Sequence, residues 1–170
     1  MENFKILKLK GNSFEMKEDF LVEEVPLTII LNNKELVTLL CTPEDVEDLI
    51  RGFLFTSGLI SDVADISQIG VDRQRWAVYI KLVKKDISED LIFKRLYTSG
   101  CGKGTLFYNA HDMLKSEKIK TNVQVKSTSI FILMKEFQKK SLLYTKTGGA
   151  HSAAIADNEN IIVFREDIGR

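Results

Sequence analysis

The feature that most constrains the fold of this chain is a glycine-rich segment near its middle, TSGCGKGT, at residues 98–105. Three glycines in eight residues oppose a packed helix or strand, because glycine adds no side chain to a core and loses the most freedom on ordering. The segment therefore predicts a flexible loop between two halves. We predict a β-rich N-terminal part with one helix at 1–96, a cysteine loop at 97–105 and a second part at 106–170.

The N-terminal part has the short apolar and β-branched runs of a sheet. The runs LTIIL at 27–31 and LVTLL at 36–40 flank the turn signal Asn32-Asn33-Lys34 and predict a hairpin. Pro26 is expected at a strand start or an edge, because proline cannot donate to a ladder. Two more strands are predicted at 66–71 and 76–83.

Helices are predicted where apolar residues recur at helical spacing. One is expected to start at Thr42, a good N-cap followed by proline, and to stop at Gly58. Another is predicted at 127–139, and weaker patterns favour short helices at 88–96 and 105–114.

The C-terminal end has the pattern of a β-hairpin. Runs at 151–156 and 161–164 flank the polar turn Asp157-Asn158-Glu159-Asn160. The chain then reads REDIGR with no closing helix. One face of this hairpin is therefore expected to lack a cover within the chain, which fits a fragment or a face covered by another subunit.

The charge balance narrows the function classes. Lys+Arg 24 equals Asp+Glu 24, which removes the usual signature of general nucleic-acid binding. No apolar run of about 18 residues predicts a membrane span, and the first twenty residues lack an apolar signal core. Two cysteines make no disulfide framework. A reducing cytoplasm is the expected location.

The two cysteines have different surroundings. Cys101 lies between Gly100 and Gly102, and Lys103 favours its thiolate. The residues alone leave open whether it is a reactive thiol or a cysteine that happens to lie in a loop. Cys41 follows an apolar run and is predicted to be structural and buried.

Other chemistries fit the sequence poorly. The two cysteines and two histidines show no short ligand spacing, so no metal site is predicted. A phosphate loop fails because Tyr97 and Gly104 occupy its key positions. A Cys–His protease stays a minor alternative, since no residue is placed to orient the pair. His151 after Thr-Gly-Gly, and Asp167 near the chain end, are either ligand-binding groups or ordinary turn residues.

Four segments in chain order carry a resemblance to a known family. They are EEVPLTIILNNKELVTLLCTPEDVEDLIRGFLFTSGLI, TSGCGKG, TGGAHSAAIAD and REDIGR. Together they resemble the formate dehydrogenase accessory protein family, FdhD, from about residue 23 to 170. The resemblance implies an α+β protein whose second part is a partial cytidine deaminase-like α/β layered domain. The deaminase zinc ligands and catalytic glutamate are absent, so the likeness is one of fold only.

The resemblance also implies a function. Such a protein is a sulfurtransferase-type sulfur carrier that takes persulfide sulfur from a cysteine desulfurase. It passes the sulfur to the bis-molybdopterin guanine dinucleotide cofactor, with molybdenum or tungsten, of formate dehydrogenase. The position that matches the carrier cysteine is Cys101, and a homodimer is implied. The implied cofactor-binding residues are Thr147, Gly148, Gly149, His151, Glu166, Asp167, Gly169 and Arg170.

Two departures from the family keep alternatives open. Many members have a Cys-x-x-Cys pair in the loop, and here the second position is Gly104. The family pattern also continues beyond REDIGR, so the chain is expected to be C-terminally truncated relative to it. A non-catalytic adaptor that binds the cofactor or formate dehydrogenase, or a non-functional truncated product, are the alternatives.

Overall fold

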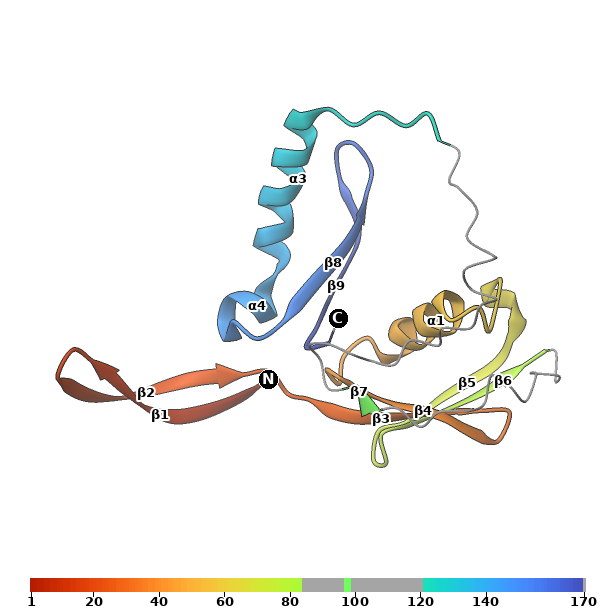
Figure 1. Cartoon of the computed structure of the whole chain (residues 1–170), viewed down its shortest axis with the longest axis horizontal. Helices are drawn as coiled ribbons and strands as arrows, with labels where there is room; N and C mark the ends of the chain where they lie inside the picture. Colours follow the sequence, from red (N-terminus) through yellow and green to blue (C-terminus); the bar gives the residue numbers. More distant parts are fainter. Residues whose placement is uncertain (84–96, 99–120, 170) are drawn as a thin grey trace. The chain divides into compact units, whose positions relative to one another are not determined.

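The structure is a computed structural model, and it describes residues 1–83, 97–98 and 121–169 (Figure 1). The chain divides into two compact units, one formed by 24–119 and the other by 1–23 together with 120–170. Each unit is described by itself.

The 24–119 unit is built on a mixed five-stranded sheet with the order β5-β6-β3-β4-β7. The pairs β3–β4 and β5–β6 are antiparallel, whereas β3–β6 and β4–β7 are parallel. The predicted β3–β4 hairpin is confirmed, and Asn32 and Asn33 make its turn with φ of 48° and 66°. Two positive φ values define the turn that matches the twist of hairpin strands. The strands are β3 (Val25–Leu31), β4 (Lys34–Cys41), β5 (Ile66–Asp72), β6 (Ala77–Leu82) and β7 (Tyr97–Thr98).

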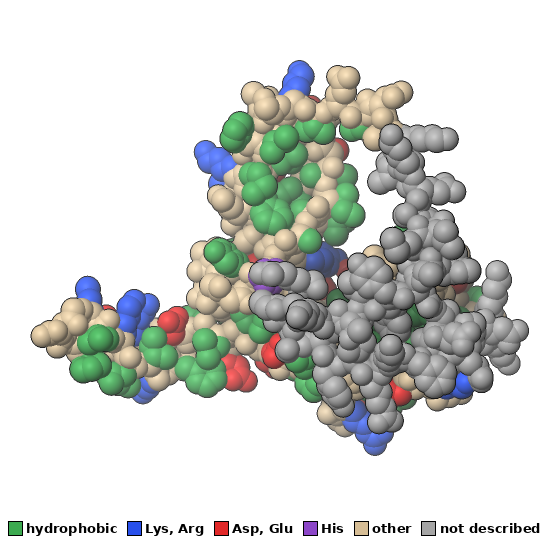
Figure 2. All heavy atoms as spheres, viewed as in Figure 1, with side chains coloured by type: hydrophobic (Ala, Val, Ile, Leu, Met, Phe, Trp, Pro, Cys, Tyr) green, Lys and Arg blue, Asp and Glu red, His purple; other side chains and the backbone are tan. Residues whose placement is uncertain are grey.

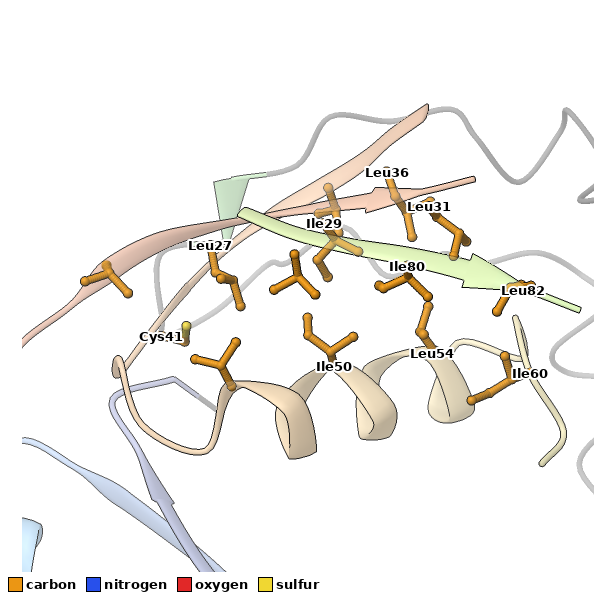
Figure 3. Close-up of a cluster of buried hydrophobic side chains, with 14 residues drawn as sticks. Leu27, Ile29, Leu31, Leu36, Cys41, Ile50, Leu54, Ile60, Ile80 and Leu82 are labelled. Atoms are coloured by element: carbon orange, nitrogen blue, oxygen red, sulfur yellow. The ribbon is translucent and has the colours of Figure 1, made fainter. Parts of the chain in front are cut away.

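The core of this unit lies between the sheet and helix α1 (Val46–Thr56), which precedes the short helix η1 (Val63–Asp65). Ile50 and Leu54 of α1 point toward Ile29 and Ile80 of the sheet, and all four side chains are fully buried (Figure 3). Alternate residues of β3 and β6 face α1, as the period of a strand requires. Cys41 is 1% exposed and lies in the same cluster, which confirms the prediction that it is buried.

Helix α1 begins later than predicted. Thr42 is 3% exposed and directly follows β4, and the N-cap of the helix is Asp45. The chain instead turns at Asp45, whose φ of 47° is left-handed, and the helix starts at the next residue. The predicted stop is confirmed, because Gly58 has a φ of 68° and donates its N–H to the Phe55 carbonyl at 3.0 Å.

The other unit combines two hairpins with two helices (Figure 1). Strands β1 (Glu2–Lys10) and β2 (Ser13–Leu21) pair antiparallel, and so do β8 (His151–Ala156) and β9 (Ile161–Asp167). The predicted C-terminal hairpin is therefore confirmed. Helix α3 (Ser127–Lys140) matches the prediction to within one residue, and helix α4 (Leu142–Thr147) was not predicted.

Helix α3 packs on one face of the β8–β9 hairpin. The rings of Phe137 and Phe164 meet edge to face with centroids 5.3 Å apart, a favoured aromatic geometry. Ile155 and Val163 are direct partners on the opposite face, and they are 66% and 41% exposed. That face therefore has little cover, in agreement with the prediction from the sequence.

The elements make an α+β fold, while the deaminase-like layering stays a prediction. The predicted boundaries at 96 and 105 lie at residues outside the described part of the chain, as do the predicted helices at 88–96 and 105–114. The sequence did not anticipate that 1–23 group with 120–170. Among the helices described, none is long and apolar enough to cross a membrane.

Candidate functional site

The open end of the β8–β9 hairpin, opposite its turn, brings several predicted site residues together. His151, the first residue of β8, is the register partner of Asp167, the last residue of β9. Both are half-buried. Direct partners in an antiparallel ladder share a face, so these two polar side chains project from the same side of the hairpin.

Glu166 and Ser152 form the next pair and project from the other side. The Glu166 carboxylate accepts the backbone N–H of Leu143 at 2.9 Å and of Tyr144 at 3.0 Å. These are first-turn N–H groups of α4, which have no partner within the helix. Glu166 therefore caps α4 from a neighbouring strand and fixes the hairpin against it.

Two serines complete this contact, and the sequence did not single them out. Ser141 is 5% exposed and donates its hydroxyl to the Phe137 carbonyl at 3.0 Å. Its hydroxyl also lies 3.2 Å from that of Ser152, which in turn donates to Glu166 at 3.4 Å. The sequence offers one signal for Ser152. Because it follows His151 in a predicted strand, its side chain is expected on the opposite face of the hairpin.

The Thr147-Gly148-Gly149 segment ends α4 and leads into β8. Gly148 has a φ of 67° and donates its N–H to the Tyr144 carbonyl at 2.7 Å, the left-handed cap that favours glycine. The Gly149 N–H donates to the Thr147 hydroxyl at 3.2 Å, and that hydroxyl donates to the Leu143 carbonyl at 2.7 Å. A phosphate bound by these amides would have to replace the Thr147 hydroxyl at Gly149.

Gly149 lies close to Val22. A Cβ added there would lie 3.3 Å from Val22 Cγ2, tighter than ordinary packing. The residue that follows β2 therefore packs directly against the segment between α4 and β8.

The chain beyond β9 is held by Asp167. Its carboxylate accepts the Gly169 N–H at 2.6 Å, so the predicted residues Asp167 and Gly169 are in direct contact. Arg170 and Cys101 lie outside the described residues. Across the described ranges, no three His, Cys, Asp or Glu side chains gather as a metal site.

Comparison with known proteins decides the family. The model of the FdhD/NarQ family matches residues 22–170. The chain belongs to this family. It is 38% identical over 154 residues to the sulfur carrier protein FdhD of Bacillus subtilis, covering 90% of this chain and 59% of that protein. It is 35% identical over 170 residues to the protein of the same name from Listeria monocytogenes, covering 98% of this chain and 65% of that protein.

A solved structure agrees with the fold. The crystal structure assigned to a formate dehydrogenase accessory protein from Desulfotalea psychrophila has a TM-score of 0.76 and 20% identity. The match covers 99% of this chain and 63% of that one. At this identity the likeness shows the fold alone. The chain thus spans 59% and 65% of the two curated relatives and 63% of the solved chain.

Proposed function

We propose that this protein is a sulfur carrier for formate dehydrogenase maturation, with Cys101 as the carrier thiol. The observation that carries the proposal is the family match over 22–170, which includes the glycine-flanked cysteine. Curated relatives at 33% to 38% identity are named sulfur carrier proteins. The donor we propose is a cysteine desulfurase, and the acceptor is the bis-molybdopterin guanine dinucleotide cofactor.

The burial of Cys41 supports the choice of thiol. A carrier must present its sulfur first to a donor and then to an acceptor, and a thiol that is 1% exposed within a core cluster can do neither. The chain has two cysteines. Cys101, flanked by glycines and followed by Lys103, is therefore the thiol that can react as thiolate.

The first step is a thiol–persulfide exchange. The Cys101 thiolate attacks the terminal sulfur of the donor's persulfide, the donor S–S bond breaks, and the donor cysteine leaves as a thiolate. Cys101 then holds the added sulfur as a persulfide. Electrons balance in this step, because one S–S bond is exchanged for another.

The second step needs two electrons. Release of the terminal sulfur as sulfide to the cofactor reduces the Cys101 persulfide to a thiolate. A second thiol in the loop would supply the electrons by forming a disulfide, but that position is Gly104. We therefore assign the reduction to two external thiols. The first attacks the inner sulfur of Cys101, so that the terminal sulfur leaves as sulfide and a mixed disulfide forms. The second attacks that mixed disulfide, the Cys101 thiolate leaves, and the external thiols end as a disulfide.

We place the cofactor against the hairpin face that carries His151 and Asp167, beside Thr147, Gly148 and Gly149. Gly169 and Arg170 follow Asp167, and an arginine pairs well with a phosphate. Glu166 has a different part, because its carboxylate already accepts hydrogen bonds from α4. It positions the hairpin rather than touching the ligand.

Further parts of the proposal follow the family. We propose that the reaction takes place in the cytoplasm, that the second part of the chain has deaminase-like layering, and that the protein acts as a homodimer. Neither a resident metal nor a nucleic acid is required for the reaction as written.

Intact-protein mass spectrometry tests the carrier. The reduced protein is incubated with a cysteine desulfurase and cysteine, and we expect one added sulfur of about 32 Da. Cys101→Ala should lose the added mass, and Cys41→Ala, the matched control, should keep it. A folded, reduced wild-type protein that gains no sulfur would overturn the carrier and favour a cofactor-binding adaptor.

A further inference from the structure

The β8–β9 hairpin has a second face, opposite the one that packs on α3. Phe164 packs on α3 and Glu166 caps α4, so the side chains of that first face serve the fold. Side chains alternate between the two faces of a strand, and Val163, Arg165 and Asp167 of β9 therefore lie on the second face. We call this second face the outer face.

The outer face has a fixed order of side chains along the hairpin. Three of its pairs precede the register shift near the turn, and from the open end they are His151 with Asp167, Ala153 with Arg165, and Ile155 with Val163. Successive pairs on one face lie about 7 Å apart. The face therefore changes from polar to cationic to apolar, and among its described residues Arg165 is the one arginine or lysine.

The backbone amides beside this face offer little to an anion. The Gly148 N–H donates to the Tyr144 carbonyl at 2.7 Å, and the Gly149 N–H donates to the Thr147 hydroxyl at 3.2 Å. Asp167 adds a carboxylate at the open end of the hairpin, and like charges repel. A diphosphate bound to the outer face therefore needs a cation, and it is favoured away from the open end.

Arg165 has the charge and the position that a diphosphate needs. A guanidinium is planar and always charged, and it can pair with two phosphate oxygens at once. The strand partner Ala153 is small, so the Arg165 side chain can lie across the hairpin without meeting a bulky neighbour. In the structure its Nη1 donates to the Phe164 carbonyl at 2.7 Å. A phosphate oxygen is the stronger acceptor, because it carries a negative charge and the carbonyl does not.

The pairs on either side of Arg165 suit different parts of the ligand. The Asp167 carboxylate is an acceptor group, and guanosine presents donors, the N–H groups of its base and the hydroxyls of its ribose. Ile155 and Val163 are 66% and 41% exposed, and Figure 2 shows hydrophobic side chains gathered over α3 and the hairpin. An apolar surface suits the flat pterin at the other end of the dinucleotide.

We propose that Arg165 binds the diphosphate of the cofactor, so that the dinucleotide lies along the hairpin with its guanosine at Asp167 and its pterin toward Ile155 and Val163. The inference rests on the proposed function, because it takes the cofactor as the ligand of this face. The diphosphate then lies about 7 Å from the open end. Asp167 binds the nucleoside and Arg165 binds the phosphates, so a ligand without phosphates distinguishes the two residues.

A comparison of guanosine diphosphate with guanosine tests this assignment in the 170-residue chain. NMR shift titrations measure both dissociation constants, and wild type should bind the diphosphate more tightly. Arg165→Gln should weaken the binding of guanosine diphosphate about tenfold or more and leave guanosine binding unchanged. Arg165→Lys should recover part of the loss, because lysine keeps the charge but not the planar pair of donors. Asp167→Asn should weaken the binding of both ligands.

The matched control is Arg75→Gln, which removes an exposed guanidinium from the 24–119 unit and should bind both ligands as wild type does. An Arg165→Gln variant that keeps the wild-type affinity for guanosine diphosphate would overturn the assignment and leave the phosphates to Arg170. Equal losses for both ligands would overturn it too, because a purely structural role predicts them. If wild type binds neither ligand, the cofactor placement of the proposed function fails, and this inference fails with it. The persulfide test reads Cys101 and is decided separately.

Discussion

His151 lies directly opposite Asp167 in the β8–β9 ladder, so both side chains project from one face of the hairpin. The pair beside them, Ser152 and Glu166, projects from the other face and contacts the residues around α4. The two pairs thus lie on opposite faces of the hairpin, and the Ser152 and Glu166 pair holds the hairpin against α4. Variants of His151 and Asp167 test one face, and a variant of Glu166 tests the other.

The ligand-facing side is tested with guanosine diphosphate, which is one end of the proposed cofactor. His151→Gln and Asp167→Asn should each weaken its binding about tenfold or more, because hydrogen bonds that involve a charged group contribute about 1.5–3 kcal/mol. Isothermal titration calorimetry measures the dissociation constants. Ser152→Ala is the control on the opposite face, and it should bind as wild type does. Loss of binding in Ser152→Ala alone would place the ligand on the other face.

The α4-facing side is tested by removing the Glu166 carboxylate. Glu166→Ala leaves the Leu143 and Tyr144 N–H groups without their acceptor, which we expect to cost about 1–2 kcal/mol of local stability. Hydrogen exchange by NMR should show faster exchange of these two amides. Glu159→Ala, a change in the exposed β8–β9 turn, should leave them unchanged. Equal exchange in both variants would contradict the capping role.

Local patterns predicted much of the fold. The stripe of Ile50 and Leu54 and the alternation of β6 could be read directly, since each element buries one face in the core. The β8–β9 hairpin followed from its polar four-residue turn. The opposition of His151 and Asp167 did not, because it depends on a register shift between Ile155 and Ala156.

Elements defined by distant contacts could not be predicted in this way. Helix α4 has six residues, too few to show a period, and its cap Glu166 is 23 residues from Leu143. Strands β1 and β2 lie in the part of the chain that was predicted to be β-rich, but their grouping with 120–170 depends on contacts between distant residues. Thr42 was predicted as the N-cap because threonine before proline often starts a helix. Its burial could not be read from the neighbouring residues.

The turn at Gly148 makes a further prediction. Its φ of 67° is unfavourable for residues with a Cβ, and the left-handed region costs about 1–2 kcal/mol for them. Gly148→Ala should therefore lower the free energy of unfolding of this unit by about 1 kcal/mol, measured from the hydrogen exchange of its slowest amides. Gly148→Asn should cost less, because asparagine tolerates this region. An alanine variant as stable as the wild type would show that the turn relaxes.

The turn of the same hairpin predicts a pH dependence. The Asp157 carboxylate accepts the N–H of Glu159 at 2.8 Å and of Asn160 at 2.6 Å, and these hydrogen bonds lower the pKa of Asp157 below its ordinary 3.8. A carboxyl group whose pKa is lower in the folded state stabilises the fold above its unfolded pKa. That contribution is lost as the pH falls through the folded pKa.

Carbon-13 NMR titration of the Asp157 carboxyl group measures this shift. Its midpoint should lie below 3.8, and the turn amides of Glu159 and Asn160 should exchange faster as the pH falls through it, once intrinsic exchange is corrected for. Asp157→Asn keeps an oxygen acceptor but cannot ionise, so its corrected exchange should not change over the same pH range. A midpoint at or above the ordinary value would mean that the two backbone hydrogen bonds do not persist in solution, since they favour the ionised form whenever they are made.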